Sequence, residues 1–87
     1  MKTRTIEELH DPKIGHRKFA NICDELIKRG YKITDIKEYN EQFKFKCNGY
    51  EFTFRKEWKS SVKDFVNYFI NVFNTQMELI KYMEAHK

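Results

Sequence analysis

Five histidine and cysteine side chains in this 87-residue chain are candidates for a base, a nucleophile or a metal ligand. A neutral imidazole can take up a proton or bind a metal, and a thiolate can attack an electrophile. These residues are His10, His16, His86, Cys23 and Cys47. No histidine is spaced from a cysteine or carboxylate as a ligand set or a nucleophile–base pair would require. We interpret the histidines as exposed helix residues and the cysteines as buried thiols in a reducing compartment.

Sequence motifs for catalysis are also missing. The three glycines, Gly15, Gly30 and Gly49, are isolated from one another, so no glycine-rich loop can cradle a phosphate. The patterns H-E-x-x-H, C-x-x-C and G-x-S-x-G do not occur, and the carboxylates are scattered. The sequence therefore predicts no enzymatic activity, no catalytic residue, no cofactor and no metal site.

Lysines and arginines are the next candidates, because they can contact phosphates or acidic surfaces. The chain has 17 Lys and Arg against 13 Asp and Glu, a formal net charge of +4. These cations form no tail or block, which is a weaker pattern than the clustered footprint of a nucleic-acid-binding domain. A mildly basic solvated surface and a phosphate-binding patch both stay open. Direct nucleic-acid binding would use the polar sheet face and the start of the following helix, through Lys44, Lys46, Arg55, Lys56, Lys59 and Lys63.

Apolar residues outside the predicted helical stripes are candidates for contact with a protein, since protein interfaces are enriched in aromatic residues and Met. They are Trp58, Tyr68, Ile70, Met77 and Tyr82. Each could instead complete the core or a homodimer contact. Taken together, the predicted partner-binding residues are Lys44, Lys46, Glu51, Arg55, Lys56, Trp58, Lys59, Lys63, Tyr68 and Tyr82.

The segment FKFKCNGYEFTFR, residues 43–55, is expected to position several of these cations. Asn48-Gly49 predicts a two-residue type I′ turn, because both residues tolerate a positive φ. Such a turn sets Cys47 opposite Tyr50, Phe45 opposite Phe52 and Phe43 opposite Phe54, with Lys46–Glu51 and Lys44–Thr53 on the other face. The four phenylalanines could be a platform for stacking bases, but amphipathic helices need an apolar surface to cover, so we assign them to the core. The accessible sheet face then carries Lys44, Lys46, Glu51, Thr53 and Arg55.

Helical patterns come before this hairpin. Residues Thr5 to Glu8 fit a capping box that opens one or two turns, and Asp11-Pro12 is expected to begin a second helix. The apolar residues of that helix recur at helical spacing up to a stop at Gly30. Residues 31–39 are typical of a strand. In a regular strand their apolar side chains would fall on both faces, and a bulge near Thr34-Asp35 would bring them to one face.

The last 27 residues predict further helix. Ser60 or Ser61 can act as N-cap, and an apolar stripe follows from Val62 onward. One helix over residues 61–86 would measure about 39 Å, too long for so small a body, so we expect two helices separated at Asn74-Thr75. The predicted fold is α+β, a three-stranded antiparallel sheet with helices on one face in the order (α)α-β-β-β-α-α. It forms one domain over residues 1–87, with residues 1–11 as a short N-terminal arm or helical turn.

Three families share parts of this layout. The helix–strand–strand–strand–helix order resembles double-stranded-RNA-binding domains, whose last helix opens with a basic cluster where this chain has WKSSVKDF. The segment LIKRGYKI resembles the start of HicA-type mRNA-cleaving toxins, whose catalytic histidine lies on a following strand where this chain has Tyr39-Asn40-Glu41-Gln42.

The element order, the Asn-Gly hairpin and the segment SSVKDFVNYFINVFN resemble the small prophage anti-CRISPR inhibitors of Cas9 with an α-β-β-β-α-α fold, over roughly residues 20–80. The acidic members of that family block a DNA-binding groove by imitating DNA. This chain has the turn Cys47-Asn48-Gly49-Tyr50 and the last helix QMELIKYMEAHK, which contain few acids. The resemblance therefore implies a fold and a phage setting, and DNA mimicry is not the expected mechanism.

These observations predict a small non-enzymatic phage-type binding protein. It would inhibit or modulate a host macromolecular machine stoichiometrically, and Cas9 or another CRISPR–Cas effector is the target that the resemblance implies. The partner is a host protein or protein–nucleic-acid complex, with direct nucleic-acid binding as the alternative, and the chain itself is a monomer or homodimer. No apolar run approaches the roughly 20 residues that cross a membrane, and no signal peptide is visible, so the expected location is the host cytosol.

Overall fold

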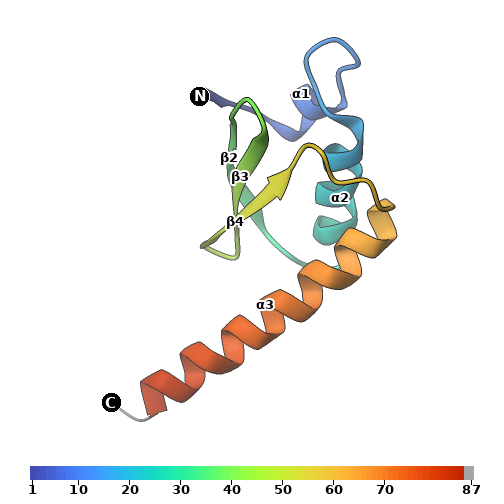
Figure 1. Ribbon diagram of the computed structural model, residues 1–87. Helices are drawn as coiled ribbons and strands as arrows, with labels where there is room; N and C mark the ends of the chain where they lie inside the picture. Colours follow the sequence, from blue (N-terminus) through green and yellow to red (C-terminus); the bar gives the residue numbers. More distant parts are fainter. Residues whose placement is uncertain (86–87) are drawn as a thin grey trace.

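The computed structural model describes residues 1–85, and its elements pack helices against one side of a sheet (Figure 1). The chain belongs to the α+β class, as predicted. In chain order the elements are β1 (Lys2–Thr3), α1 (Ile6–His10), α2 (Arg17–Lys28), β2 (Ile33–Glu38), β3 (Gln42–Cys47), β4 (Tyr50–Arg55) and α3 (Val62–Ala85).

The sheet has four antiparallel strands in the order β1-β2-β3-β4, so the prediction of three strands was wrong. Part of the predicted N-terminal arm is the additional strand, with Lys2 opposite Glu38 and Thr3 opposite Lys37. The Arg4 amide extends the pairing by donating to the Ile36 carbonyl at 2.9 Å. A two-residue strand has no alternation of apolar and polar residues, so its pairing is set by the neighbouring edge of β2 and not by a local pattern.

The hairpin of β3 and β4 confirms the predicted pairing. Cys47 lies opposite Tyr50, Phe45 opposite Phe52, and Phe43 opposite Phe54. Asn48 and Gly49 have φ angles of 51° and 88°, as a type I′ turn requires. The side chain of Asn48 also accepts a hydrogen bond from the Lys32 amide at 2.8 Å, so the turn is tied to the start of β2.

Strand β2 contains the predicted bulge. Its register against β3 shifts between Thr34 and Lys37, and Asp35 within this stretch has a φ of 51°. The bulge turns Ile36 into the core, where it is 4% exposed, and sets Lys37 directly opposite Lys44 on the other face.

The N-terminal helices differ in part from expectation. Thr5 and Glu8 form the predicted capping box of α1. The second helix does not begin after Asp11, because the Asp11 carboxylate and carbonyl accept from the amides of Lys13 and Gly15 and close a separate turn. Helix α2 begins at Arg17 with His16 as N-cap, whose Nδ1 accepts from the Phe19 amide at 3.2 Å. Its start lies five residues beyond the predicted one.

The core lies between the sheet and the helices and is largely aromatic. Phe19 of α2 stacks on Phe43 and Phe54, with ring centroids 4.6 Å and 5.0 Å away. Phe45 is buried as well, and Phe52 is half-buried against Phe69 of α3 at 4.8 Å. The assignment of these phenylalanines to the core is confirmed, with Phe52 at its margin.

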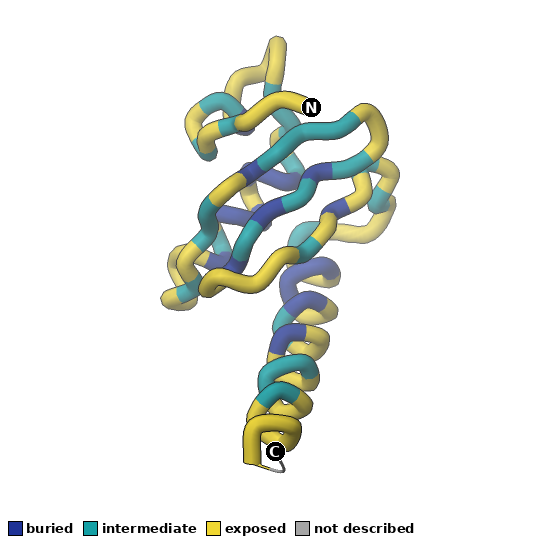
Figure 2. Tube along the Cα trace, turned by 90° about the vertical axis from the view of Figure 1, so that its left-hand side faces the viewer, coloured by how far each residue is buried: buried dark blue, intermediate teal, exposed yellow. Residues whose placement is uncertain are grey.

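Helix α3 runs unbroken from Val62 to Ala85, so the predicted separation at Asn74-Thr75 was wrong. Ser61 accepts from the Asp64 amide at its start, as expected. The Thr75 hydroxyl does not begin a new helix but donates to the Asn71 carbonyl one turn earlier at 2.9 Å. The 24 residues span about 36 Å, and the second half of the helix projects beyond the body (Figures 1 and 2). No helix within residues 1–85 has the length and apolarity to cross a membrane.

Candidate interaction surfaces

The face of the sheet opposite the helices is uncovered, and Figure 2 shows buried and part-exposed residues alternating along its central strands. The strand registers place its residues in two main rows. The first row is Thr3, Lys37, Lys44 and Thr53, and the second is Thr34, Lys46 and Glu51. Arg55 lies opposite Gln42 at one end of the same face. We call this surface the open sheet face.

The cations of the open sheet face differ in their partners. Lys46 pairs with Asp35 at 3.4 Å, although Glu51 lies opposite it as predicted, and Arg55 pairs with Glu57 at 3.5 Å. Lys44 lies over the Tyr39 ring, with Nζ 5.6 Å from the centroid.

Lys37 and Lys44 face each other across β2 and β3. Within residues 1–85 neither has a carboxylate at ion-pair distance. Like charges directly opposite each other on a sheet repel, so this pair is the least compensated positive charge on the face.

Lys56 is held away from this surface by an ion pair. Its Nζ lies 2.7 Å from Glu38 Oε2, and Arg4 Nε lies 2.8 Å from Glu38 Oε1. The hydrogen bond from Lys56, with that from Arg4, holds the pKa of Glu38 below its ordinary value despite partial burial. Lys56 also covers the Phe43 ring at 5.0 Å. This cluster joins the N-terminal arm to β2 and to the end of β4, so Lys56 has a structural role.

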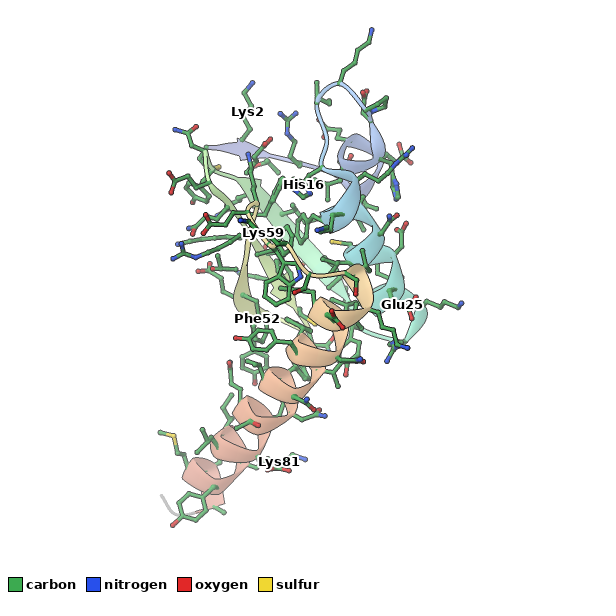
Figure 3. All side chains as sticks on the ribbon, turned by 45° about the vertical axis from the view of Figure 1, so that its right-hand side comes forward. Lys2, His16, Glu25, Phe52, Lys59 and Lys81 are labelled. Atoms are coloured by element: carbon green, nitrogen blue, oxygen red, sulfur yellow. The ribbon has the colours of Figure 1, made fainter. Side chains whose placement is uncertain are left out.

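The connection between β4 and α3 carries Trp58 and Lys59. Trp58 is half-buried, with its ring 5.1 Å from Phe65 and 5.9 Å from Tyr68. Lys18 of α2 holds this connection by donating to the carbonyls of Trp58 and Ser60 at 2.9 Å and 3.0 Å. Lys59, labelled in Figure 3, is exposed. Trp58 therefore mainly anchors the connection.

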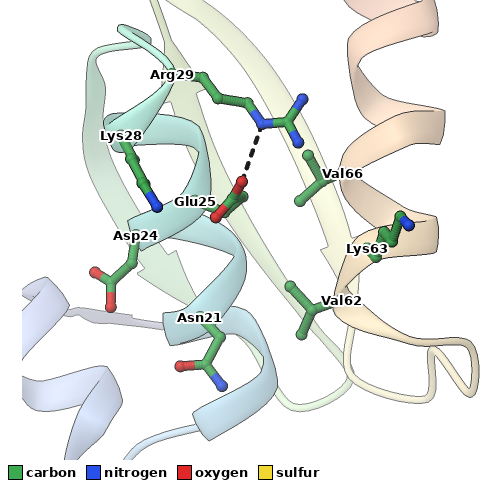
Figure 4. Close-up of a pocket in the computed structure, with 8 residues that line it drawn as sticks. All are labelled: Asn21, Asp24, Glu25, Lys28, Arg29, Val62, Lys63 and Val66. Atoms are coloured by element: carbon green, nitrogen blue, oxygen red, sulfur yellow. Dashed lines mark hydrogen bonds and ion pairs between the residues drawn. The ribbon is translucent and has the colours of Figure 1, made fainter.

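Lys63 lies on the helical side of the molecule, in a groove of about 700 Å³ between α2 and α3 (Figure 4). The groove is lined by Asn21, Asp24, Glu25, Lys28, Arg29, Val62, Lys63 and Val66. Arg29 and Glu25 pair within it at 3.1 Å, so its charges are mixed and partly compensated. The start of α3 and the open sheet face therefore do not form one continuous cationic surface.

The apolar candidates divide between core and surface. Ile70 and Met77 are half-buried and pack against the core. Tyr68 and Tyr82 are 57% and 63% exposed. Sequence reasoning did not single out three further exposed apolar residues of α3, Val72, Leu79 and Met83, because it assigned them to a covered stripe.

The histidines and cysteines take up structural positions. His10 and Asp24 join α1 to α2 across 2.7 Å, and the pair is exposed. His16 caps α2 and lies edge-on to Phe43 and Phe54, and His86 lies outside the described residues. The prediction of buried thiols is confirmed, and burial raises the pKa of Cys23 to about 12 and that of Cys47 to about 11. Within the described part of the chain, no three His, Cys, Asp or Glu side chains gather around a point where a metal could bind.

Lys37 is the candidate that sequence reasoning missed. Its place opposite Lys44 depends on the bulge in β2, and the sequence left that register open. The sequence predicted the bulge near Thr34-Asp35 but not the pairing of Thr34 with Lys46, which together with the bulge sets Lys37 opposite Lys44.

No protein-family model, no curated protein and no solved structure matches this chain. The resemblance to Cas9 inhibitors stays a prediction from the sequence.

Proposed function

We propose that this is a non-enzymatic binding protein that inhibits or modulates a larger macromolecular machine stoichiometrically. The observation that carries the proposal is the Lys37–Lys44 pair, which lies in the middle of an uncovered sheet face and within residues 1–85 has no carboxylate at ion-pair distance. A pair of like charges facing each other costs a fold roughly 0.2–1 kcal/mol. Contact with an anionic partner would replace this repulsion by favourable ion pairs. The arrangement therefore favours a negatively charged target surface.

Two chemistries provide such a target surface: acidic side chains, and phosphates on the nucleic acid of a protein–nucleic-acid complex. The neighbouring ion pairs of Lys46 and Arg55 are exposed and would exchange partners at little cost. The resemblance to prophage Cas9 inhibitors makes a guide-loaded CRISPR effector the first target to test. A cationic face would address the RNA or an acidic protein surface of that effector, since it cannot take the place of DNA in a cationic groove.

The test is a DNA-cleavage assay with guide-loaded Cas9 and other CRISPR effectors at increasing amounts of the protein. We expect inhibition that is complete near a one-to-one ratio, and comigration of the two components in size-exclusion chromatography. The variant Lys37→Glu/Lys44→Glu should lose inhibition. Lys13→Glu/Lys28→Glu carries the same charge change on exposed positions outside the sheet and should keep it. Undiminished cleavage at a large excess for every effector contradicts a CRISPR target, and equal loss in both variants contradicts the sheet face.

Direct binding of free nucleic acid is a second candidate function, favoured by the same lysine pair. Lys37, Lys44, Lys46 and Arg55 could neutralise up to four phosphates. The observed log–log dependence of affinity on salt would then have a slope of about −3.6 for duplex DNA. Absence of any shift of duplex or single strand at low salt would exclude this candidate without affecting the first.

A further inference from the structure

The projecting half of α3 carries apolar side chains that the body does not cover. Phe73, at 7% exposed, is the last buried residue of the helix, and from Asn74 to Ala85 every residue is at least part-exposed. Leu79 and Met83 are 58% and 66% exposed. Most helical stability in proteins comes from the packing of an apolar face, so a partner surface on these last three turns would stabilise them.

Three exposed apolar residues and the part-exposed Gln76 follow a regular spacing. Val72, Gln76, Leu79 and Met83 are separated by four, three and four residues, the a/d spacing of helices that pack side by side. We call these four residues the α3 seam. At 100° per residue, Ile80 lies on one flank of the seam, and Tyr82 and Tyr68 lie on the other.

Charged residues avoid this seam. Glu78 and Lys81 lie on the opposite side of the helix, and Glu84 lies at its margin. Lys81 is labelled in Figure 3 on the projecting part of α3. A nearly uncharged apolar band fits a partner that presents an equally wide, uncharged helical band. A second copy of the chain presents such a band.

The seam is also self-complementary when the two helices run antiparallel. One two-fold axis sets Val72 opposite Met83 of the second copy and, at the same time, Gln76 opposite Leu79 of the second copy. Antiparallel packing pairs a positions with d positions in this way, and a two-fold contact uses the same patch on both subunits. The body covers mainly the first half of α3 (Figure 1), so an antiparallel pair sets the two bodies toward opposite ends of the helix pair.

The area available is sufficient for such a dimer. A fully covered aromatic side chain buries about 150–250 Å², so Tyr68 and Tyr82, at 57% and 63% exposed, each present on the order of 100 Å². Within the paired stretch, the seam together with Ile80 and Tyr82 contains six side chains, which present on the order of 500 Å² per copy. The total for two copies is close to the roughly 1,000 Å² that a specific interface needs.

We propose that the protein forms a two-fold homodimer through the α3 seam, with the helices antiparallel over residues 72–83. Such a dimer would present two open sheet faces on one particle. The proposal does not depend on the function of those faces.

The first test measures the mass of the chain by sedimentation or light scattering over a range of concentrations. We expect twice the mass of one chain, with dissociation on dilution. Leu79→Lys/Met83→Lys puts charges into the seam and should weaken dimerisation by more than about tenfold, because both positions become desolvated on association. Asn67→Lys/Asn74→Lys adds the same charge on the opposite side and should leave the dimer intact. These four residues are exposed, so neither variant disturbs the core.

The second test determines the helix direction. In an antiparallel dimer, Val72→Cys and Met83→Cys chains form a disulfide with each other when mixed, and neither forms one with itself. In a parallel dimer each variant would crosslink to itself. A wild-type chain that stays monomeric at all concentrations, or a seam variant that dimerises as well as its control, would overturn the proposal. Self-crosslinking of each single variant would overturn the antiparallel arrangement.

Discussion

The carboxylate of Glu38 links three strands at one end of the sheet. It accepts from Arg4 and Lys56, whose side chains come from the N-terminal arm and from the end of β4. All three side chains are largely covered, with exposures of 20%, 14% and 26%. Charge-assisted hydrogen bonds in such partly buried settings are stronger than those on an open surface, so this cluster ties β1 and β4 to β2.

Replacing Glu38 by Gln should lower the free energy of unfolding at neutral pH by about 1–3 kcal/mol, because two cations lose their shared negative charge and one of the two acceptor oxygens becomes a donor. The pKa of Glu38 is lowered in the native state, so the unfolded chain binds more protons below the ordinary value of 4.5. The stabilisation is therefore complete above this pH and is lost as the pH falls through the native pKa. Urea unfolding between pH 7 and pH 3 measures this dependence.

The Glu38→Gln variant should show a smaller loss of stability in acid than the wild type. Some dependence should persist, because Glu8 also has a lowered pKa, through its hydrogen bonds with Thr5 and Arg4. Glu41→Gln is the matched control, since Glu41 is exposed and within residues 1–85 its side chain has no ion pair. Equal destabilisation by the two substitutions would contradict the role of the cluster.

At the scale of elements, local signals predicted local structure. Asn48-Gly49 fixed the hairpin register, and Thr5 with Glu8 fixed the start of α1, because each signal acts within a few residues. The start of α2 was misplaced because Asp11 is used in a turn of its own. Strand β1 was missed because a two-residue strand is defined by its partner and not by its own sequence.

The candidate surfaces were predictable to the extent that they depend on one hairpin. The face of Lys44 and Lys46 follows from the turn alone, and both lie where predicted. The separation of Lys56 and Lys63 from that face depends on contacts with Glu38 and α2, which lie far away in the sequence. The exposed seam depends on the continuity of α3, which the sequence argument rejected because it judged a helix of about 39 Å too long for so small a body.

The turn between α1 and α2 depends on the absence of a side chain at Gly15. A Cβ there would lie well inside 3.0 Å of the carbonyl oxygens of Glu8 and Leu9. Gly15→Ala should therefore displace the turn or α1 and lower the free energy of unfolding by about 1–3 kcal/mol.

Chemical denaturation of Gly15→Ala measures this loss. Lys13→Ala, in the same turn with an exposed side chain, should change stability by less than about 0.5 kcal/mol. If Gly15→Ala were as stable as the wild type, the close approach of the turn to α1 would not hold.

At the scale of the whole molecule, the body and the projecting helix are separable. The longest extent is 48 Å against 25 Å and 23 Å in the other directions, and the second half of α3 contributes much of this length. The aromatic contacts between α3 and the body end with Phe73, which meets Tyr31 at 5.3 Å and Phe52 at 5.8 Å, and Met77 is the last residue to pack on the core. The body therefore has its full core without residues beyond Met77.

Ending the chain at Met77 should consequently leave the unfolding temperature of the dilute protein nearly unchanged, because the deleted residues contribute nothing to the buried core. The full-length chain should unfold at a higher temperature as its concentration rises, since association stabilises the folded state by mass action. The shortened chain and Leu79→Lys/Met83→Lys should lack this dependence. Calorimetry at several concentrations separates the two effects. A large loss of stability on truncation at high dilution would show that the second half of α3 supports the body itself, and a concentration-independent full-length chain would show that it engages no second copy.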